Sequence, residues 1–358
     1  MNSFIQEIQR VYTANETRPT MILVLGMHRS GTSVTSRLLE CLGAVQSKKL
    51  MPVQLDNPKG FFEDQEVQRF NDDKLLHRFG IKWHSLAFAK WDTLSKSEWA
   101  ELEIEAVNII KNNYSLDNPL SVLKEPRICI LLPFWLSVLK KSGYDVKVIC
   151  SIRDPLSVSR SLNARDGFSI THGGMLYVTN WLSILTNIYD LPVAFIEFDE
   201  ILADSSKVLG AVSKQLAIGY PADFEERLRV FSSEFLDASL RHSKVDLENL
   251  QHEQALPMLS IDIYKKLLRA AQVQDLKNTA DVNLFAKKTI LSLEQIFAEF
   301  DILRAKIEEK DATIAEKNAM LIRLEKTIDC MKNSKIWRLS WPIRLLDEKL
   351  KALIKIFR

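Results

Sequence analysis

The sequence has few cysteines and histidines and no long hydrophobic run. Its 358 residues include four cysteines, none in a C-x-x-C pair, and six histidines without an H-x-x-x-H pattern. Such scattered thiols and imidazoles argue against a disulfide framework and against a metal site, and they suit a reducing cytosol. No stretch approaches the roughly 18 uninterrupted apolar residues of a membrane span, and the polar residues 1–20 do not resemble a signal peptide. We therefore expect a cytoplasmic protein without a bound metal.

The net charge of +2 conceals a strongly basic C-terminal segment. Residues 332–358 contain eight Lys/Arg and two Asp/Glu, a net +6 that leaves −4 for residues 1–331. The basic tail, residues 333–358, also carries Trp337 and Trp341 among aliphatic residues. This composition is typical both of a helix in an anionic membrane interface and of a helix packed on a partner protein. Peripheral contact with the inner membrane face therefore stays open, and no nucleic-acid partner is expected.

Four short apolar runs alternate with helical patterns. Hydrophobic residues make up 46% of the chain and charged residues 26%, which is ordinary for a globular protein with an ample core. The runs are Met21–Leu25, Leu120–Leu123, Val146–Ile152 and Val193–Phe198. Continuous Val/Ile/Leu runs between helices imply a parallel sheet covered on both faces. We predict an α/β fold with a P-loop-like parallel sheet flanked by helices, followed by a helical region from about residue 205 to 300.

After residue 300 the apolar pattern has a seven-residue period. The second seam position holds Leu303, Leu324 and Met331, but Lys310 and Lys317 interrupt it. Residues at the first seam position are all apolar: Phe300, Ile307, Ile314, Leu321 and Ile328. Two interpretations remain, a coiled coil of roughly four heptads through which chains associate, and one amphipathic helix folded back on the body. The predicted organisation is a catalytic domain at 1–285, a long coiled-coil helix at 286–332 and the basic tail at 333–358.

A glycine-bounded turn, residues 26–33, follows the first predicted strand and opens a helical pattern at Val34–Leu42. A strand, a tight turn and a helix direct backbone N–H groups and a helix N-terminus at a phosphate. The turn reads Gly26-Met27-His28-Arg29-Ser30-Gly31-Thr32-Ser33. It departs from the nucleotide loop G-x-x-x-x-G-K-[ST] because Thr32 occupies the lysine position, and Arg29 is its only cation. We predict that the turn binds an anion and does not hydrolyse ATP.

Basic residues also follow the second and third predicted strands. The sequence Lys124-Glu125-Pro126-Arg127 follows one strand, and Arg153-Asp154-Pro155 follows the next. Ligands of open parallel sheets bind beyond the carboxyl ends of the strands, so these cations predict an electropositive cleft for an anionic nucleotide. Arg153 and Ser161, eight residues apart, form a reasonable clamp for a second phosphate. A capped helix start explains Asp154 and Pro155 equally well.

Taken in this order, the motifs resemble those of the PAPS-dependent sulfotransferases. The residues that carry the resemblance are Arg29-Ser30-Gly31-Thr32, Lys124-Glu125-Pro126-Arg127, and Arg153-Asp154-Pro155 with Ser161. The turn at residues 26–33 is similar to that of the bacterial branch that modifies cell-surface glycans and other small hydroxyl acceptors. The stretch Val193–Asp204 is similar to the last core strand and acidic turn of the family. The resemblance covers about residues 18–215 and extends by continuity to about 285.

The resemblance implies transfer of a sulfonate from 3′-phosphoadenosine 5′-phosphosulfate (PAPS) to a hydroxyl of a carbohydrate or lipid-linked glycan. Such a reaction belongs to polysaccharide biosynthesis, and the resemblance implies that it needs no metal. It implies that Arg153 and Ser161 hold the 3′-phosphate and that Lys124, together with Arg29, stabilises charge on the transferring group. The residues implied for the 5′-phosphosulfate are Arg29, Ser30, Gly31, Thr32 and Ser33. Arg29 stands where the family most often has lysine, and Glu125 replaces the aspartate of a K-D-P element.

Transfer to a hydroxyl requires a proton acceptor, and Glu63 is the candidate catalytic base. It ends the segment Asn57-Pro58-Lys59-Gly60-Phe61-Phe62-Glu63. Desolvation beside the two aromatic residues would raise the pKa of its carboxyl toward a useful range. The other interpretation is an ordinary surface acid next to Asp64 and Glu66. His28 is the alternative candidate for the base. Because it lies within the anion loop, its position fits two other roles equally well, a hydrogen-bond donor to the sulfonate and a packed loop residue.

Two other functions stay open. One is a small-molecule kinase with a degenerate P-loop, against which Thr32 in the lysine position argues. The other is a non-catalytic nucleotide-binding scaffold whose coiled coil and tail recruit an assembly. The sequence does not specify the acceptor, which we expect to contact the segments 57–84 and 166–177.

Overall fold

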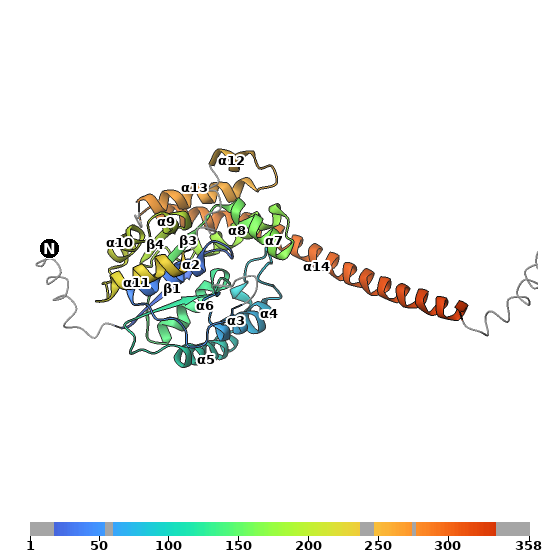
Figure 1. Ribbon diagram of the computed structural model, residues 1–358, viewed down its shortest axis with the longest axis horizontal. Helices are drawn as coiled ribbons and strands as arrows, with labels where there is room; N and C mark the ends of the chain where they lie inside the picture. Colours follow the sequence, from blue (N-terminus) through green and yellow to red (C-terminus); the bar gives the residue numbers. More distant parts are fainter. Residues whose placement is uncertain (1–17, 54–59, 237–246, 274–276, 334–358) are drawn as a thin grey trace, which may run out of the picture. The chain divides into compact units, whose positions relative to one another are not determined.

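The computed structural model describes residues 18–53, 60–236, 247–273 and 277–333 (Figure 1). The chain divides into two compact units, residues 1–298 and residues 299–358. Of the predicted basic tail only Asn333 lies within the described residues, and the Asn57-Pro58-Lys59 part of the candidate acceptor segment lies outside them.

A four-stranded sheet in the order β2-β1-β3-β4 forms the centre of the first unit. Every neighbouring pair is parallel. The strands are β1 (Thr20–Leu25), β2 (Leu120–Lys124), β3 (Asp145–Ile152) and β4 (Val193–Glu197). They coincide with the four predicted apolar runs to within one residue at each end, because strands buried on both faces are apolar throughout. The prediction of an α/β fold with a parallel sheet is confirmed.

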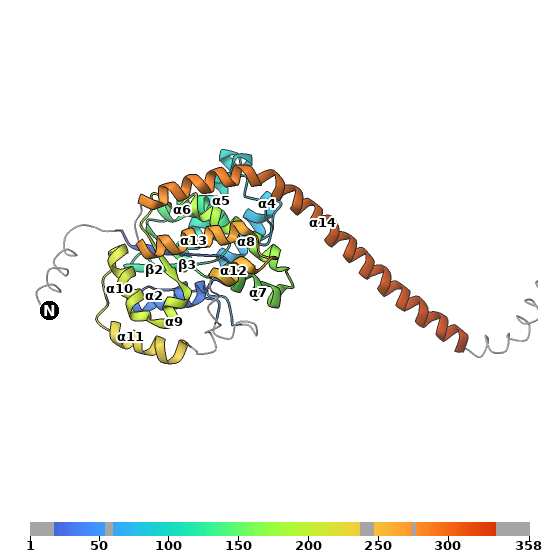
Figure 2. The same cartoon turned by 90° about the horizontal axis from the view of Figure 1, so that it is seen from above.

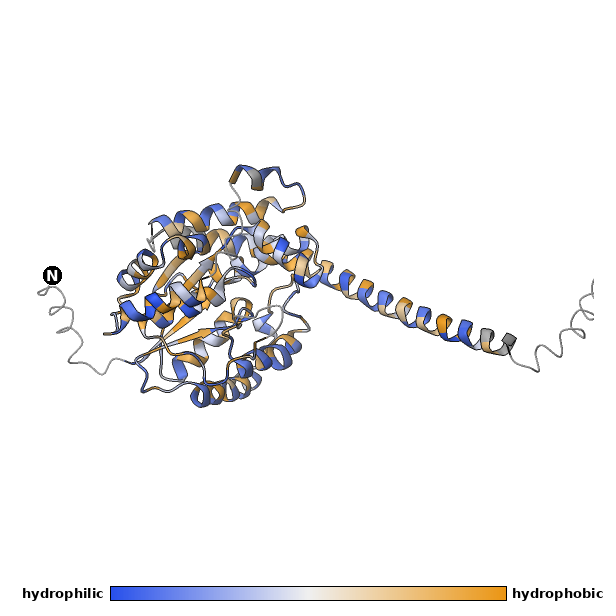
Figure 3. Cartoon of the chain, viewed as in Figure 1, coloured by the Kyte–Doolittle hydropathy of each residue, from blue (hydrophilic) through white to orange (hydrophobic). Residues whose placement is uncertain are grey.

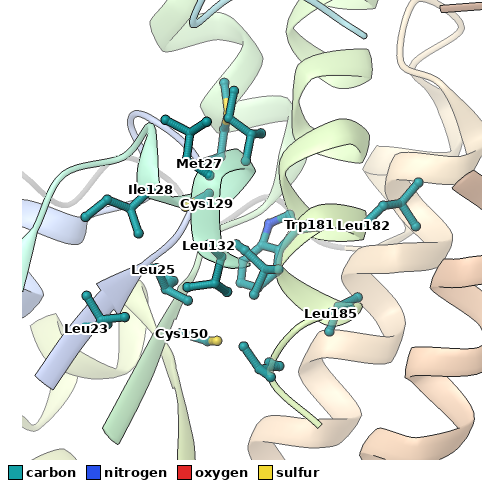
Figure 4. Packing of buried hydrophobic residues seen from close by; sticks show 14 of the residues in the cluster. Leu23, Leu25, Met27, Ile128, Cys129, Leu132, Cys150, Trp181, Leu182 and Leu185 are labelled. Carbon is teal, nitrogen blue, oxygen red and sulfur yellow. The ribbon is translucent and has the colours of Figure 1, made fainter. Parts of the chain in front are cut away.

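Alternate residues of β1 enter two separate hydrophobic cores. Met21, Leu23 and Leu25 pack with helices α6 (Ile128–Lys141) and α8 (Ile170–Leu185), and Figure 4 shows Leu25 beside Leu132 and near Cys150. Ile22 and Val24 pack instead with α2 (Thr32–Leu39) and α10 (Ser205–Leu216). The two pairs of helices therefore cover opposite faces of the sheet (Figure 2). Figure 3 shows hydrophobic residues along the strands and mixed residues on the helices that cover them.

The remaining described elements are helical. As predicted, the described residues between 205 and 300 contain helices and no strand. Among the described residues, no helix is both long and apolar enough to span a bilayer. The α-helices are α3 (Gln65–Phe70), α4 (His77–Phe79), α5 (Lys96–Asn113), α7 (Pro155–Asp166), α9 (Phe198–Ala203), α11 (Phe224–Val230), α12 (Leu247–His252), α13 (Met258–Val273) and α14 (Lys277–Asn333). Short 3₁₀ turns occupy Glu40–Leu42 and Trp91–Thr93, and π-helical turns occupy Asn71–Leu76 and Phe231–Phe235.

Helix α7 begins as predicted and packs closely on α8. The Asp154 side chain accepts a hydrogen bond from the Ser157 backbone N–H, and Pro155 is the first helical residue. A Cβ atom on Gly173 of α8 would lie 2.8 Å from the Ser159 Cα of α7, which is too close for two saturated carbons. Gly173 therefore allows the close approach of α7 and α8. The predicted site residue Ser161 lies on α7.

Replacing Gly173 with alanine should lower the free energy of unfolding by about 1–3 kcal/mol, because α7 and α8 would have to move apart. Urea denaturation measures this loss. Gly219→Ala is the matched control, since a Cβ there meets no atom within 4 Å and its effect should be small. Equal losses at both positions would contradict the packing described here.

Candidate anion-binding site

A cavity of about 140 Å³ lies where β1, β2 and β3 end. It brings together every predicted site residue except Ser30 and Ser161. The lining residues are His28, Arg29, Gly31, Thr32, Ser33, Val34, Phe61, Glu63, Lys124, Pro126, Arg153, Arg165 and Phe198. A larger cavity of about 380 Å³ lies between α3 and α5, but exposed ions of both signs line it, such as Lys74 and Glu105, 3.6 Å apart. The smaller cavity is the candidate site because its charged lining residues are basic except for Glu63 and it lies at the carboxyl edge of the sheet.

The loop between β1 and α2 is tight and needs glycine at both ends. Gly26 has a φ of 155° and Gly31 a φ of 83°. A Cβ on Gly26 would lie 2.7 Å from the Ser151 carbonyl oxygen, and one on Gly31 would lie 2.2 Å from the Phe198 ring. Between them Arg29 adopts a φ of 70°, a left-handed conformation that few residues other than glycine take. The loop backbone is therefore strained, and helix α2 begins at Thr32, which lines the cavity.

Two polar groups of this loop are buried without a hydrogen-bond partner in the described part of the chain. They are the Ser30 hydroxyl and the His28 Nε2 atom. The Ser30 backbone is nevertheless well fixed, since its carbonyl accepts a hydrogen bond from the Ser151 hydroxyl at 2.9 Å. Buried polar groups are nearly always paired in folded proteins. Of the two, His28 lines the cavity and can offer a hydrogen bond to a bound group, whereas Ser30 does not line it.

Arg29, Ser161 and Arg153 form one connected group. Arg29 Nε donates to Ser161 Oγ at 2.8 Å, and Arg153 Nη1 donates to the Arg29 carbonyl oxygen at 3.1 Å. The Arg153 guanidinium also lies 4.9 Å from the centroid of the Phe198 ring. The resemblance implied that Ser161 acts beside Arg153, whereas in the structure its hydroxyl contacts Arg29. The donor-binding roles predicted for the three residues stay predictions.

Lys124 and Glu63 form a buried ion pair. Lys124 Nζ lies 2.6 Å from Glu63 Oε1, and it also donates to the Phe61 carbonyl at 2.8 Å and to Ser33 Oγ at 3.2 Å. The side chains of Lys124 and Glu63 are 2% and 7% exposed. The reading of Glu63 as a surface acid is therefore wrong. The carboxylate that we expected beside Phe61 and Phe62 also has an ammonium as its hydrogen-bond partner, which the sequence did not indicate.

The backbone around Phe62 explains this placement of Glu63. Gly60 has a φ of 91° and Phe62 a φ of 53°, so the segment turns sharply just before Glu63. The Phe62 ring packs edge-on against Phe235, with 5.6 Å between the ring centroids. Asp64, the next residue, caps helix α3 by accepting from the Glu66 and Val67 backbone N–H groups. Glu63 is thus held between a strained turn and a capped helix, and its carboxylate lies at the cavity.

Glu125 and Arg127 stabilise the end of β2 but do not line the cavity. The buried Glu125 carboxylate accepts hydrogen bonds from Asn71 and Arg127, and Arg127 also pairs with Asp72 at 2.6 Å. Burial raises the pKa of Glu125, and the Arg127 charge opposes that rise. Lys124 and Pro126 are therefore the members of the Lys124–Arg127 motif that face the site.

His28 is a half-buried, neutral histidine. Its ring centroid lies 4.6 Å from that of Trp83. Burial, followed by the charges of Arg127, Arg165, Lys124 and Arg29, holds the pKa of His28 well below its ordinary value. At neutral pH the imidazole is therefore uncharged and contributes no positive charge to the cavity.

The depressed pKa of His28 makes folding stability depend on pH. Below about pH 6.5 the unfolded chain binds a proton at His28 and the folded chain does not, so stability falls as the pH decreases. The contribution should approach about 1.4 kcal/mol per pH unit between pH 6.5 and the folded pKa. Urea unfolding at pH 7, 6 and 5 should show a flatter profile for both His28→Phe and His28→Gln. A pH dependence identical to that of the wild type in both variants would contradict this assignment.

Arg165 and Phe198 line the cavity but were not among the predicted site residues. Arg165 lies one helical turn after Ser161 on α7; it pairs with Asp166 at 2.8 Å and lies 5.3 Å from the centroid of the Trp83 ring. The i, i+4 spacing from Ser161 would have indicated it, since residues so spaced share a helix face. Phe198 follows β4 directly. Applying the carboxyl-end rule to the fourth strand would have indicated this residue.

No group of three or more His, Cys, Asp or Glu side chains in the described ranges is arranged to hold a metal ion.

No protein-family model matches the sequence, and no curated protein matches it. Solved structures to which the chain is similar include a sulfotransferase domain from the Synechococcus PCC 7002 olefin synthase, which is 14% identical in sequence. The match covers 71% of this chain and 97% of that domain, with a TM-score of 0.38. A sulfotransferase domain from the curacin biosynthetic pathway has 17% identity, with 70% and 98% covered and a TM-score of 0.38. A sulfotransferase from Mycobacterium tuberculosis H37Rv has 14% identity, with 74% and 80% covered and a TM-score of 0.35. These likenesses are distant.

Proposed function

We propose that this chain is a PAPS-dependent sulfotransferase that transfers a sulfonate to a hydroxyl group of a carbohydrate or lipid-linked glycan. The observation that carries the proposal is the charge of one cavity. Arg29, Lys124, Arg153 and Arg165 reach it from three separate segments of the chain, while Glu63 is the single acid among its lining residues. Such a site is complementary to a compact ligand with several negative charges. PAPS carries two phosphates and a sulfonate, and a tight loop at a helix N-terminus suits one of these groups.

In this proposal the Arg29–Ser33 loop holds the 5′-phosphosulfate. His28 lines the cavity, and its Nε2 atom, which lacks a partner among the described residues, would gain one in the bound donor. Arg153 would hold the 3′-phosphate, and the contact between Arg29 and Ser161 ties this end of the site to the loop. Arg165 adds a further cation that neutralises the donor.

We assign the proton transfer to Glu63. The acceptor hydroxyl would give its proton to the Glu63 carboxylate while its oxygen forms a bond to sulfur. The bond between sulfur and the bridging phosphate oxygen breaks, and 3′,5′-ADP leaves with the electron pair. Lys124, which touches Glu63 at 2.6 Å, stabilises charge on the transferring group. Burial and four neighbouring cations lower the pKa of His28, so we assign it the role of a hydrogen-bonding group.

Calorimetry and thermal shift test the nucleotide class. We expect 3′,5′-ADP to bind and to raise the melting temperature in the absence of magnesium. A saturating ligand at about a hundredfold excess over its Kd stabilises by roughly 2.7 kcal/mol. Binding of Mg-ATP without binding of 3′,5′-ADP would favour the kinase alternative and overturn the proposal.

Incubation with donor labelled in the sulfonate, together with cell-envelope glycan and lipid extracts, tests the reaction. The proposal expects a labelled glycan whose formation is slowed strongly by Glu63→Gln. If transfer occurs at an unchanged rate in that variant, Glu63 is not the base. If 3′,5′-ADP binds but no extract yields a labelled product, the scaffold alternative gains support.

A further inference from the structure

Beyond residue 298, helix α14 carries an exposed apolar stripe. Figure 3 shows hydrophobic and hydrophilic residues alternating along this part of the helix. The members of the stripe are large side chains that are 48–60% exposed: Phe300, Leu303, Ile307, Ile314, Leu321 and Leu324. Large hydrophobic side chains scattered singly on a surface need no explanation, but a regular row of them does. The stripe is therefore a candidate interaction surface.

The spacing of the stripe is that of a heptad seam. Steps of three and four residues place these side chains on one face of a helix. Phe300, Ile307, Ile314 and Leu321 occupy the first seam position, and Leu303 and Leu324 occupy the second. β-branched isoleucine at the first position, present here at 307 and 314, and leucine at the second, present at 303 and 324, are the residues found in two-stranded parallel coiled coils, although no single heptad of this chain combines the two. We propose that this stripe is the seam of a parallel, in-register coiled coil with a second copy of this chain.

The charges beside the seam favour the same arrangement. In a parallel pair in register, the residue just before a first seam position faces the partner residue five positions later. Glu299 then faces the partner's Arg304, and Lys306 faces the partner's Asp311, so both pairs are attractive and each occurs twice by symmetry. Arg304 also pairs with Glu308 of its own helix, with Nε and Oε1 3.0 Å apart, and would share its guanidinium between the two carboxylates. An antiparallel pair centred on residue 312 would instead bring Asp311 close to the partner's Asp311.

Lys310 and Lys317 occupy the second seam position and weaken the pair. Both are exposed in the single chain, and long lysine stems can lie along apolar surface with the ammonium in water. In the parallel register Lys310 also lies beside the partner's Asp311. Polar residues in a seam lower stability but restrict register and strand number. The pair should therefore be specific and of moderate strength.

Cysteine cross-linking of the full chain tests both partner and orientation. In a Cys330→Ser background, Leu324→Cys places a thiol in the seam, and Ile322→Cys places one on the outer face two residues away. Under mild oxidation, the first variant should form a disulfide-linked dimer at least tenfold faster than the second. Equal rates would overturn the proposal. Faster cross-linking of a mixture of Leu303→Cys and Leu321→Cys chains than of either alone would show the antiparallel pair, and would also overturn it.

Light scattering provides a second measurement that does not depend on engineered thiols. The wild type should have twice the mass of the chain, and Ile314→Glu should shift it to a single chain because it puts a charge in the seam. Ile322→Glu, outside the seam, should leave the dimer intact. A single-chain mass for the wild type, or a trimer, would contradict the proposal.

Discussion

Replacement of Lys124 with methionine should lower the free energy of unfolding by about 3–5 kcal/mol, the usual result of removing one partner of a buried ion pair. The side chains of Lys124 and Glu63 are 2% and 7% exposed, so little water reaches the carboxylate that the substitution leaves behind. Methionine has a similar volume and fills the space, which keeps cavity formation from contributing to the loss. Urea unfolding at pH 7 measures the effect.

The double variant Glu63→Gln/Lys124→Met is the control for this loss. It removes both charges, and buried ion pairs can often be replaced by neutral residues of similar size without a large change in stability. We expect the double variant to recover most of the stability that Lys124→Met loses. If the single and double variants lose the same amount, the ion pair does not stabilise the fold and the packing of the lysine stem accounts for the effect.

The same variants separate catalysis from binding. The proposed partner of Lys124 is the transferring sulfonate, which 3′,5′-ADP lacks. Affinity for 3′,5′-ADP should therefore change by less than about tenfold, a change of 1.4 kcal/mol. The rate of sulfonate transfer should fall by about 10²–10³-fold, as when one electrostatic donor is removed from a reaction centre. An equal loss of affinity and rate would instead assign Lys124 to donor binding.

The sheet could be predicted from the sequence because each strand can be recognised from its own residues. A parallel strand covered on both faces is a short apolar run, and β1, β3 and β4 each stand out as such. The glycine turn after β1 is equally local, since the strand, the glycine pair and the helix lie within the 20 residues Thr20–Leu39. The carboxyl-end rule then placed Lys124 and Arg153 near that turn without any knowledge of side-chain contacts.

The pairings within the site could not be predicted in the same way. Lys124 and Glu63 are 61 residues apart, and nothing in either segment indicates that the other neutralises it. The contact between Arg29 and Ser161 spans 132 residues and depends on the left-handed backbone of Arg29, which the sequence Met-His-Arg-Ser does not reveal. Long-range contacts and unusual φ angles are set by tertiary packing. The sequence thus indicated which residues gather at the sheet edge, but not which of them contact each other.

Replacing Arg153 with methionine should weaken the binding of 3′,5′-ADP by about 100-fold. Hydrogen bonds to charged groups contribute about 1.5–3 kcal/mol, and an arginine that binds a phosphate in a bidentate manner makes two. Methionine preserves packing over the Phe198 ring, which lies 4.9 Å from the guanidinium, but it removes the charge and the donor to the Arg29 carbonyl. Calorimetric titration without magnesium gives the affinity.

Arg160→Met is the matched control, because it makes the same substitution nearby on α7. The Arg160 side chain is 60% exposed and lies 3.7 Å from Glu253, and it does not line the cavity. It should leave the affinity for 3′,5′-ADP unchanged. Arg153→Lys adds a second comparison: lysine keeps the charge but not the planar fork, so a recovery of only about tenfold would show that geometry contributes as much as charge. Equal affinities in Arg153→Met and Arg160→Met would mean that the second phosphate is not bound at the end of β3.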